Sequence, residues 1–160
     1  MTVYLSLGSN RGEKRAHLAR ALAALPAAGL QVRAVSRIRA TRPRSATGRA
    51  LFLNCVVKAE TRLLPHTLLR RLRRIESALG RHRGHSASRG PRTPRTVDID
   101  IVAYSGTRVA TRDLTLPHPR YREREFVLTS LAELGAWELM RGLPRRQYRP
   151  SVSLERLGLR

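Results

Sequence analysis

Two aspartates set two positions apart are the residues of this sequence that point most directly to chemistry. They lie in the stretch Pro94-Arg95-Thr96-Val97-Asp98-Ile99-Asp100-Ile101, where carboxylates alternate with branched apolar residues. Successive side chains of a strand point to opposite faces, so Asp98 and Asp100 would lie side by side on one face. Two adjacent carboxylates repel each other unless a cation lies between them. Mg²⁺ together with substrate phosphates would supply that cation, and pairing with the abundant arginines is the alternative.

Four stretches of the chain have the alternation of β-strands, and three have the periodicity of helices. The strands are predicted at 3–7, 30–40, 52–61 and from 97 onward, with a short one at 107–110, and the helices at 13–25, 65–79 and 121–134. The first six long elements follow the order of a ferredoxin-like split βαβ sandwich. This α+β fold has an antiparallel sheet with helices on one face. The other face would carry the active site, with Tyr4, Ser6, Phe52, Asn54 and both aspartates.

Composition limits the kinds of protein this chain can be. The formal net charge is +21 over 160 residues, and Lys14 and Lys58 are its only lysines. Such a charge suits a polyanion or a phosphorylated substrate, and a general bias toward arginine is the alternative. The single cysteine, Cys55, excludes an internal disulfide and a cysteine-based zinc site, and its apolar surroundings predict that it is buried. The absence of a membrane span or signal peptide predicts a soluble cytoplasmic protein.

The patterning predicts one domain over residues 1–134. Residues 135–160 form a basic C-terminal tail that is expected to pack on this domain or to extend from it, with Trp137 as a packing anchor. Two arginine-rich segments, 41–51 and 81–96, are predicted to be loops. Loops as long as the second one are usually functional or mobile.

Several short motifs, taken together, resemble the family of 6-hydroxymethyl-7,8-dihydropterin pyrophosphokinases (2-amino-4-hydroxy-6-hydroxymethyldihydropteridine diphosphokinases). They are Leu7-Gly8-Ser9-Asn10, Phe52-Leu53-Asn54, Arg74-Ile75-Glu76 with Gly80-Arg81, the stretch 94–101, Leu116-Pro117-His118, and Arg124 with Phe126. The resemblance implies an ATP-dependent transferase of folate biosynthesis. Such an enzyme moves pyrophosphate from ATP to the hydroxymethyl group of the pterin and releases AMP.

The resemblance also implies a role for each matching residue. Asp98 and Asp100 would hold two Mg²⁺ ions and act in catalysis with Arg95. Nucleotide contacts are implied for Glu76, Arg81, Arg83, Arg95, Thr115, His118 and Arg124. Pterin contacts are implied for Thr41, Pro43, Phe52, Asn54 and Phe126, with the two phenylalanines stacking on the rings. The loops 41–51 and 81–96 would act as lids that exclude water.

Two other functions compete with this prediction. The same fold serves RNA-binding modules, but two aspartates on the sheet face would repel phosphate unless metal covers them. A degenerate homologue would keep the fold and lose pterin turnover, because the loop before Asp98 departs from the family pattern. It carries Pro91-Arg92-Thr93 and Pro94-Arg95-Thr96 in tandem and lacks a tryptophan often found there. The expected partners are ATP and dihydropterin, with no membrane; nucleic acid is not expected, although the net charge does not exclude it, and the protein is expected to be a monomer.

Overall fold

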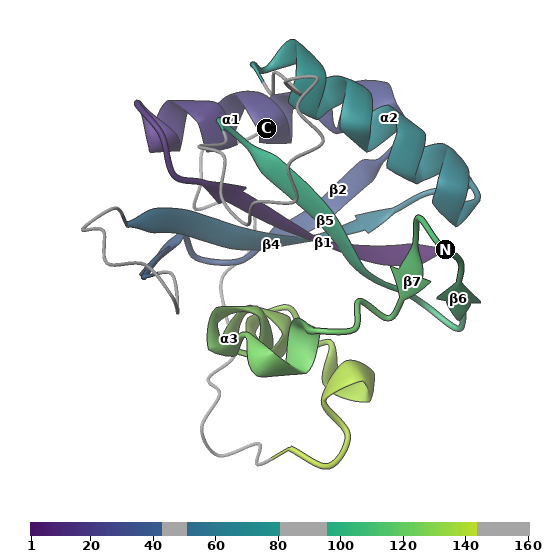
Figure 1. The fold of residues 1–160 in the computed structure, drawn as a ribbon. Helices are drawn as coiled ribbons and strands as arrows, with labels where there is room; N and C mark the ends of the chain where they lie inside the picture. Colours follow the sequence, from purple (N-terminus) through teal and green to yellow (C-terminus); the bar gives the residue numbers. More distant parts are fainter. Residues whose placement is uncertain (43–50, 81–95, 144–160) are drawn as a thin grey trace.

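A computed structural model describes residues 1–42, 51–80 and 96–143. Figure 1 shows a sheet with α1 (Lys14–Ala24) and α2 (Pro65–Ala78) on one side and α3 (Glu125–Glu133) on the other. Most of the segment 81–96, predicted to be a loop, lies outside the described residues, as do residues 43–50 of the first predicted loop. In the described part of the chain, no helix combines the length and the apolar character needed to cross a bilayer.

The sheet is antiparallel throughout. It is built from β1 (Thr2–Ser9), β2 (Gln31–Val35), β3 (Arg39–Thr41), β4 (Phe52–Glu60) and β5 (Asp98–Tyr104). The strand order is β2-β4-β1-β5. β2 and β3 pair with the same edge of β4, β2 along its last residues and β3 along its first. The predicted mixed fold with an antiparallel sheet is therefore confirmed.

The strand predicted over 30–40 is wrong in one respect, because it is two strands with a break at 36–38. At the break, side-chain oxygens accept hydrogen bonds from backbone N–H groups. In a continuous strand these N–H groups would bond to the backbone of the neighbouring strand. Val56 N donates to Ser36 Oγ at 2.9 Å, and Arg37 N donates to a carboxylate oxygen of Glu133 at 3.0 Å. The chain consequently leaves β2 and resumes as β3 beside the first residues of β4.

The main core lies between the sheet and the helices α1 and α2. Alternate residues of β1, namely Val3, Leu5 and Leu7, point into it and are fully buried. Leu18 of α1 and Leu72 of α2 meet them there. Cys55 of β4 is also fully buried, as predicted.

A second core covers part of the opposite face of the sheet, and this corrects the prediction of helices on one face alone. Tyr4, Val56 and Val102 are buried there beneath α3 and the short 3-10 helix η3 (Trp137–Met140). Trp137 packs against this core as predicted, and it is partly buried. The helix predicted over 121–134 is in fact η2 (Tyr121–Glu123) followed by α3, because Arg124 between them is extended.

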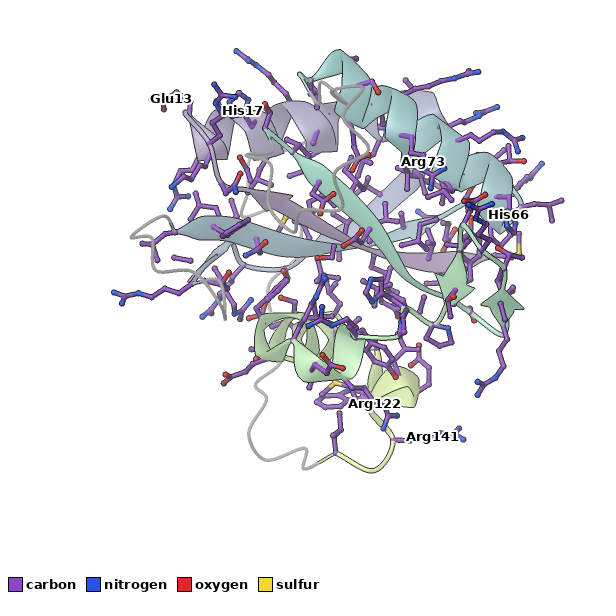
Figure 2. The ribbon with its side chains drawn as sticks, in the orientation of Figure 1. Glu13, His17, His66, Arg73, Arg122 and Arg141 are labelled. Atoms are coloured by element: carbon purple, nitrogen blue, oxygen red, sulfur yellow. The ribbon has the colours of Figure 1, made fainter. Side chains whose placement is uncertain are left out.

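Smaller elements contact the helices on each face of the sheet. The strands β6 (Val109–Ala110) and β7 (Thr115–Leu116) form a ribbon, which accounts for the end of the strand predicted at 107–110. His66 lies at the start of α2 (Figure 2), and its Nε2 is 3.1 Å from Oγ1 of Thr111, in the turn between β6 and β7. Below the sheet, Arg122 donates to the backbone oxygen of Arg141 at 3.2 Å, which joins η2 to the segment after η3 (Figure 2).

Candidate active site

Strand pairing places four residues in one row across the sheet. Arg39 of β3 pairs with Asn54 of β4, Asn54 pairs with Gly8 of β1, and Gly8 pairs with Asp98 of β5. Directly opposite residues of antiparallel strands point to the same face. Because Leu7 points toward α1 and α2, this row lies on the face that α3 partly covers. We call Asn54, Gly8 and Asp98 the site row, and Arg39 lies beside its Asn54 end.

The two aspartates lie on the same face of β5, as predicted. Asp98 pairs with Gly8, and Asp100 pairs with Ser6 two residues along β1. Burial raises the pKa of Asp100 above its usual value, and the nearby charge of Asp98 acts in the same direction. Arg124 and His118 partly oppose this rise. The pair therefore carries the mutual repulsion that the sequence suggested.

Arg124 is one of the cations that balance this repulsion. Its Nη1 lies 3.3 Å from Oδ2 of Asp100, and each of the two side chains is about one third exposed. Arg124 stands in the extended break between η2 and α3, so the first turn of α3 lies next to β5. The sequence left open whether arginine or metal meets the aspartates, and the structure gives Asp100 an arginine partner.

His118 lies beside the same cluster. Its backbone N donates to the carbonyl of Val102 at 2.8 Å, which fixes this segment against the free edge of β5. Its Nδ1 accepts from the backbone N of Arg120 at 3.1 Å. Burial lowers the pKa of the His118 imidazole, although the charge of Asp100 opposes the shift. In the neutral ring, the proton therefore lies on Nε2.

The other end of the site row carries an amide held in a fixed orientation. Asn54 is only 7 % exposed, and its Nδ2 donates to Oγ1 of Thr41 at 2.7 Å. Thr41 pairs in turn with Phe52, so these two side chains share a face of the sheet. Phe126 lies in the first turn of α3, partly buried at the margin of the second core.

Gly8 separates the two ends, and a side chain at this position would collide with the Asn54 amide as it is placed here. A methyl group on Gly8 would lie 2.6 Å from Oδ1 of Asn54, well inside contact distance. The sequence singled out Gly8 only as part of a motif. The Asn54 side chain leans over a residue that has no side chain of its own, and this arrangement depends on strand register.

Glu76 lies on the other side of β5, in the main core. It is 2 % exposed, and its Oε1 accepts from the backbone N of Ile99 at 2.8 Å. Ile99 is the residue between the two aspartates, so Glu76 of α2 anchors the strand that carries them. A nucleotide contact for Glu76 stays a prediction.

The remaining predicted site residues are not placed beside the site row by the described part of the structure. Thr115 is exposed on β7 of the ribbon. Pro43, Arg81, Arg83 and Arg95 lie outside the described residues. Within residues 1–42, 51–80 and 96–143, no three His, Cys, Asp or Glu side chains gather to hold a metal by themselves. A metal here would depend on the aspartate pair and on oxygens of a ligand.

Comparison with known protein families gives this geometry a context. The model of the family 7,8-dihydro-6-hydroxymethylpterin-pyrophosphokinase (HPPK) matches residues 4–136, which include every element that bears a site residue. The chain belongs to this family.

Individual relatives of this HPPK chain agree. A 2-amino-4-hydroxy-6-hydroxymethyldihydropteridine pyrophosphokinase of Methylorubrum extorquens is 46% identical over 135 residues, 82% of this chain and 81% of the relative. A protein of the same name from Bacillus subtilis is 41% identical over 132 residues, 82% of this chain and 76% of the relative. A third, from Aquifex aeolicus, is 34% identical over 156 residues, 96% of this chain and 94% of the relative.

The role of Gly8 can be tested by substitution. Gly8→Ala should displace the Asn54 side chain and break its bond to Thr41. Given the pterin contact that the family resemblance implies for Asn54, this would weaken pterin binding by about 1–3 kcal/mol. Calorimetric titration with 6-hydroxymethyl-7,8-dihydropterin measures this. Adding Gly8→Ala to Asn54→Ala should cost little more than Asn54→Ala alone, because the clashing amide is then gone. Additive losses would contradict the clash.

Removing the Glu76 carboxylate should loosen β5. Glu76→Ala leaves the buried N–H of Ile99 without this acceptor and opens a cavity, so the free energy of unfolding should fall by about 2–4 kcal/mol. Urea denaturation measures the loss, and hydrogen exchange at the Ile99 amide should accelerate. Ser77→Ala, at the exposed neighbouring position, is the control. Unchanged exchange at Ile99 would show that Glu76 does not anchor the strand.

Proposed function

We propose that this chain transfers a pyrophosphoryl group from ATP to the hydroxymethyl oxygen of 6-hydroxymethyl-7,8-dihydropterin and releases AMP, a step of folate biosynthesis. The site row is the observation that carries the proposal. It has an oriented amide beside Phe52 at one end and the aspartate pair with Arg124 and His118 at the other. A flat heterocycle suits the first end, and a metal-bound triphosphate suits the second.

The amide end fits a pterin. Aromatic rings such as those of Phe52 and Phe126 stack favourably on a flat ring system. The Nδ2 of Asn54 is engaged by Thr41, so its Oδ1 is left over Gly8 as an acceptor for N–H groups on the edge of the pterin.

The carboxylate end fits Mg²⁺. Asp98 and Asp100 are an adjacent pair of hard oxygen ligands. The pKa of Asp100 is raised first by burial and then by the charge of Asp98, and a bound divalent cation would favour the charged form against both. We infer that these two residues hold the ions, two in number as in paired-metal phosphoryl transfer. Bound metal would neutralise charge on the phosphate oxygens.

Arginines and His118 would supply further contacts to the triphosphate oxygens. Arg124 already points its guanidinium at Asp100, and its planar fork suits phosphate oxygens once metal occupies the carboxylate. The Nε2–H of His118 would donate to a phosphate oxygen. The family resemblance assigns similar phosphate contacts to Arg81, Arg83 and Arg95, and nucleotide contacts to Thr115 and Glu76.

The reaction then needs mostly alignment and charge stabilisation. The hydroxymethyl oxygen attacks the β-phosphorus, the bond from that phosphorus to the α,β-bridging oxygen breaks so that this oxygen leaves with AMP, and the hydroxyl proton passes to solvent water. Holding the pterin and the triphosphate on one rigid sheet brings these atoms together. Fixed cations stabilise the charge that develops on the phosphoryl oxygens.

The other proposed features rest on similar arguments. The order β2-β4-β1-β5, with α1 and α2 on one face, supports a ferredoxin-like fold with the site on the other face. An RNA-binding role is not favoured, because the sheet face carries carboxylates and part of it is covered by the second core. The monomeric state and the cytoplasmic location stay predictions.

Product analysis tests the proposed reaction. The protein, incubated with ATP and Mg²⁺, should release AMP only when 6-hydroxymethyl-7,8-dihydropterin is present, with one pterin diphosphate formed for each AMP. Chromatography of the nucleotides measures both. Release of ADP, or AMP release that ignores the pterin, would contradict pyrophosphoryl transfer.

The aspartate pair should be essential to this turnover. Asp98→Asn or Asp100→Asn removes several kcal/mol of metal-borne charge stabilisation, so pterin-dependent AMP release should fall about a thousandfold. Circular dichroism should show an intact fold, because neither side chain lies in the main core. Asp113→Asn, an exposed aspartate near the ribbon, is the matched control. Wild-type turnover in either site variant would refute the metal assignment.

A further inference from the structure

We propose that the ion pair between Arg39 and Glu133 is a positioning device that holds α3, and with it Phe126, at the correct distance from the pterin-binding strands. The inference rests on the proposed function of the site. The pair lies next to the amide end of the site row, since Arg39 is the strand partner of Asn54. Neither residue was singled out by the sequence.

Glu133 is the centre of a dense set of hydrogen bonds. Its side chain is 4% exposed and forms a salt bridge with Nη2 of Arg39. It also accepts from Nη1 of Arg39 at 3.3 Å and from the backbone N of Arg37 at 3.0 Å. Nη1 of Arg39 donates further to Oγ of Ser130, one turn earlier on α3, at 3.2 Å. Two positions of α3 are thus fixed to one guanidinium of β3.

The two ends of this link belong to opposite walls of the pterin site. Arg39 lies on β3, two residues before Thr41, which orients the Asn54 amide. Glu133 lies at the end of α3, and Phe126 lies in the first turn of the same helix. A helix is rigid over this length, so fixing its last turn also constrains the position of Phe126.

Geometry explains why this end of α3 needs its own anchor. The helix is held to β5 at its start by Arg124 and Asp100, and to β3 at its end by Glu133 and Arg39. From Arg124 to Glu133 a helix rises about 13 Å, which matches the roughly 14 Å across three strand spacings from β5 to β3. If Arg124 turns from Asp100 to phosphate when metal binds, the link through Arg39 is the one that remains.

The other contacts of α3 with the sheet cannot fix its position in the same way. Val127 and Leu131 of α3, for example, share a core with Val56, and such apolar contact has no preferred direction. A bidentate arginine–carboxylate pair has a defined geometry. Buried ion pairs often add little net stability, so a role in conformational specificity is the hypothesis that suits this one.

Substitution of Arg39 tests the inference in the full chain. Arg39→Met should raise the KM for 6-hydroxymethyl-7,8-dihydropterin by about tenfold, a factor that corresponds to a modest loss of binding energy. The KM for ATP should stay within about twofold, because the aspartate end is held by other contacts. Arg39→Lys keeps the charge but loses the fork, so it should restore part of the pterin affinity.

Two further variants keep the test decisive. Glu133→Gln keeps an acceptor for Arg37 N and serves if Arg39→Met does not fold. It should show the same selective rise in the pterin KM. Glu60→Gln breaks the pair between Arg33 Nη2 and Glu60 Oε2, at 2.8 Å across β2 and β4, with side chains 45% and 48% exposed. This matched control should change neither KM.

The outcomes separate the inference from the proposed function. A pterin KM that is unchanged in folded Arg39→Met overturns the positioning role, and so do equal rises in both KM values, which a loss of general stability would produce. Wild-type protein that shows no pterin-dependent AMP overturns the proposed function itself. Active wild type with a selective pterin defect in Arg39→Met supports both.

Discussion

The double pairing of β1 is the constraint on which the site depends. β1 pairs with β4 on one side and β5 on the other, so Gly8 stands between Asn54 and Asp98. A slip of one residue in either register would turn that neighbour to the opposite face. The register with β5 shifts between Tyr4 and Leu5, beyond the site row. The irregularity therefore lies outside the site row, and the pairing of both aspartates with β1 is regular.

The two cores hold this face from both sides. The main core keeps β5 in position through Glu76, which binds the backbone between the aspartates from the α2 side. The second core covers part of the other face with α3. The proposed site lies beside it, and α3 is held to β5 by Arg124 at its start and to β3 by Glu133 at its end.

Local patterns predicted much of this molecule. Alternation in the stretch around Asp98 gave the strand and the shared face of the two carboxylates, and apolar periodicity gave α1 and α2 with boundaries close to those observed. The family motifs predicted one site for Asn54, His118 and Arg124; the structure places His118 and Arg124 near Asp100, and the shared site stays a prediction. These features depend on neighbours in the sequence, which a pattern can report.

Features that depend on distant partners were missed. The break at Ser36 arises because its hydroxyl binds Val56, twenty residues away. The placement of α3 on the site face, the need for glycine at position 8 and the pair of Arg39 with Glu133 all depend on which strands and helices meet. No local pattern in a single sequence carries that information.

A structure of the complex with Mg²⁺, a non-hydrolysable ATP analogue and 6-hydroxymethyl-7,8-dihydropterin tests the central claim most directly. We predict the pterin against Gly8, bonded to Asn54 and stacked between Phe52 and Phe126. Its hydroxymethyl group would point to phosphates bound at Asp98 and Asp100. A pterin bound away from the site row, or phosphates bound away from the aspartates, would contradict the account.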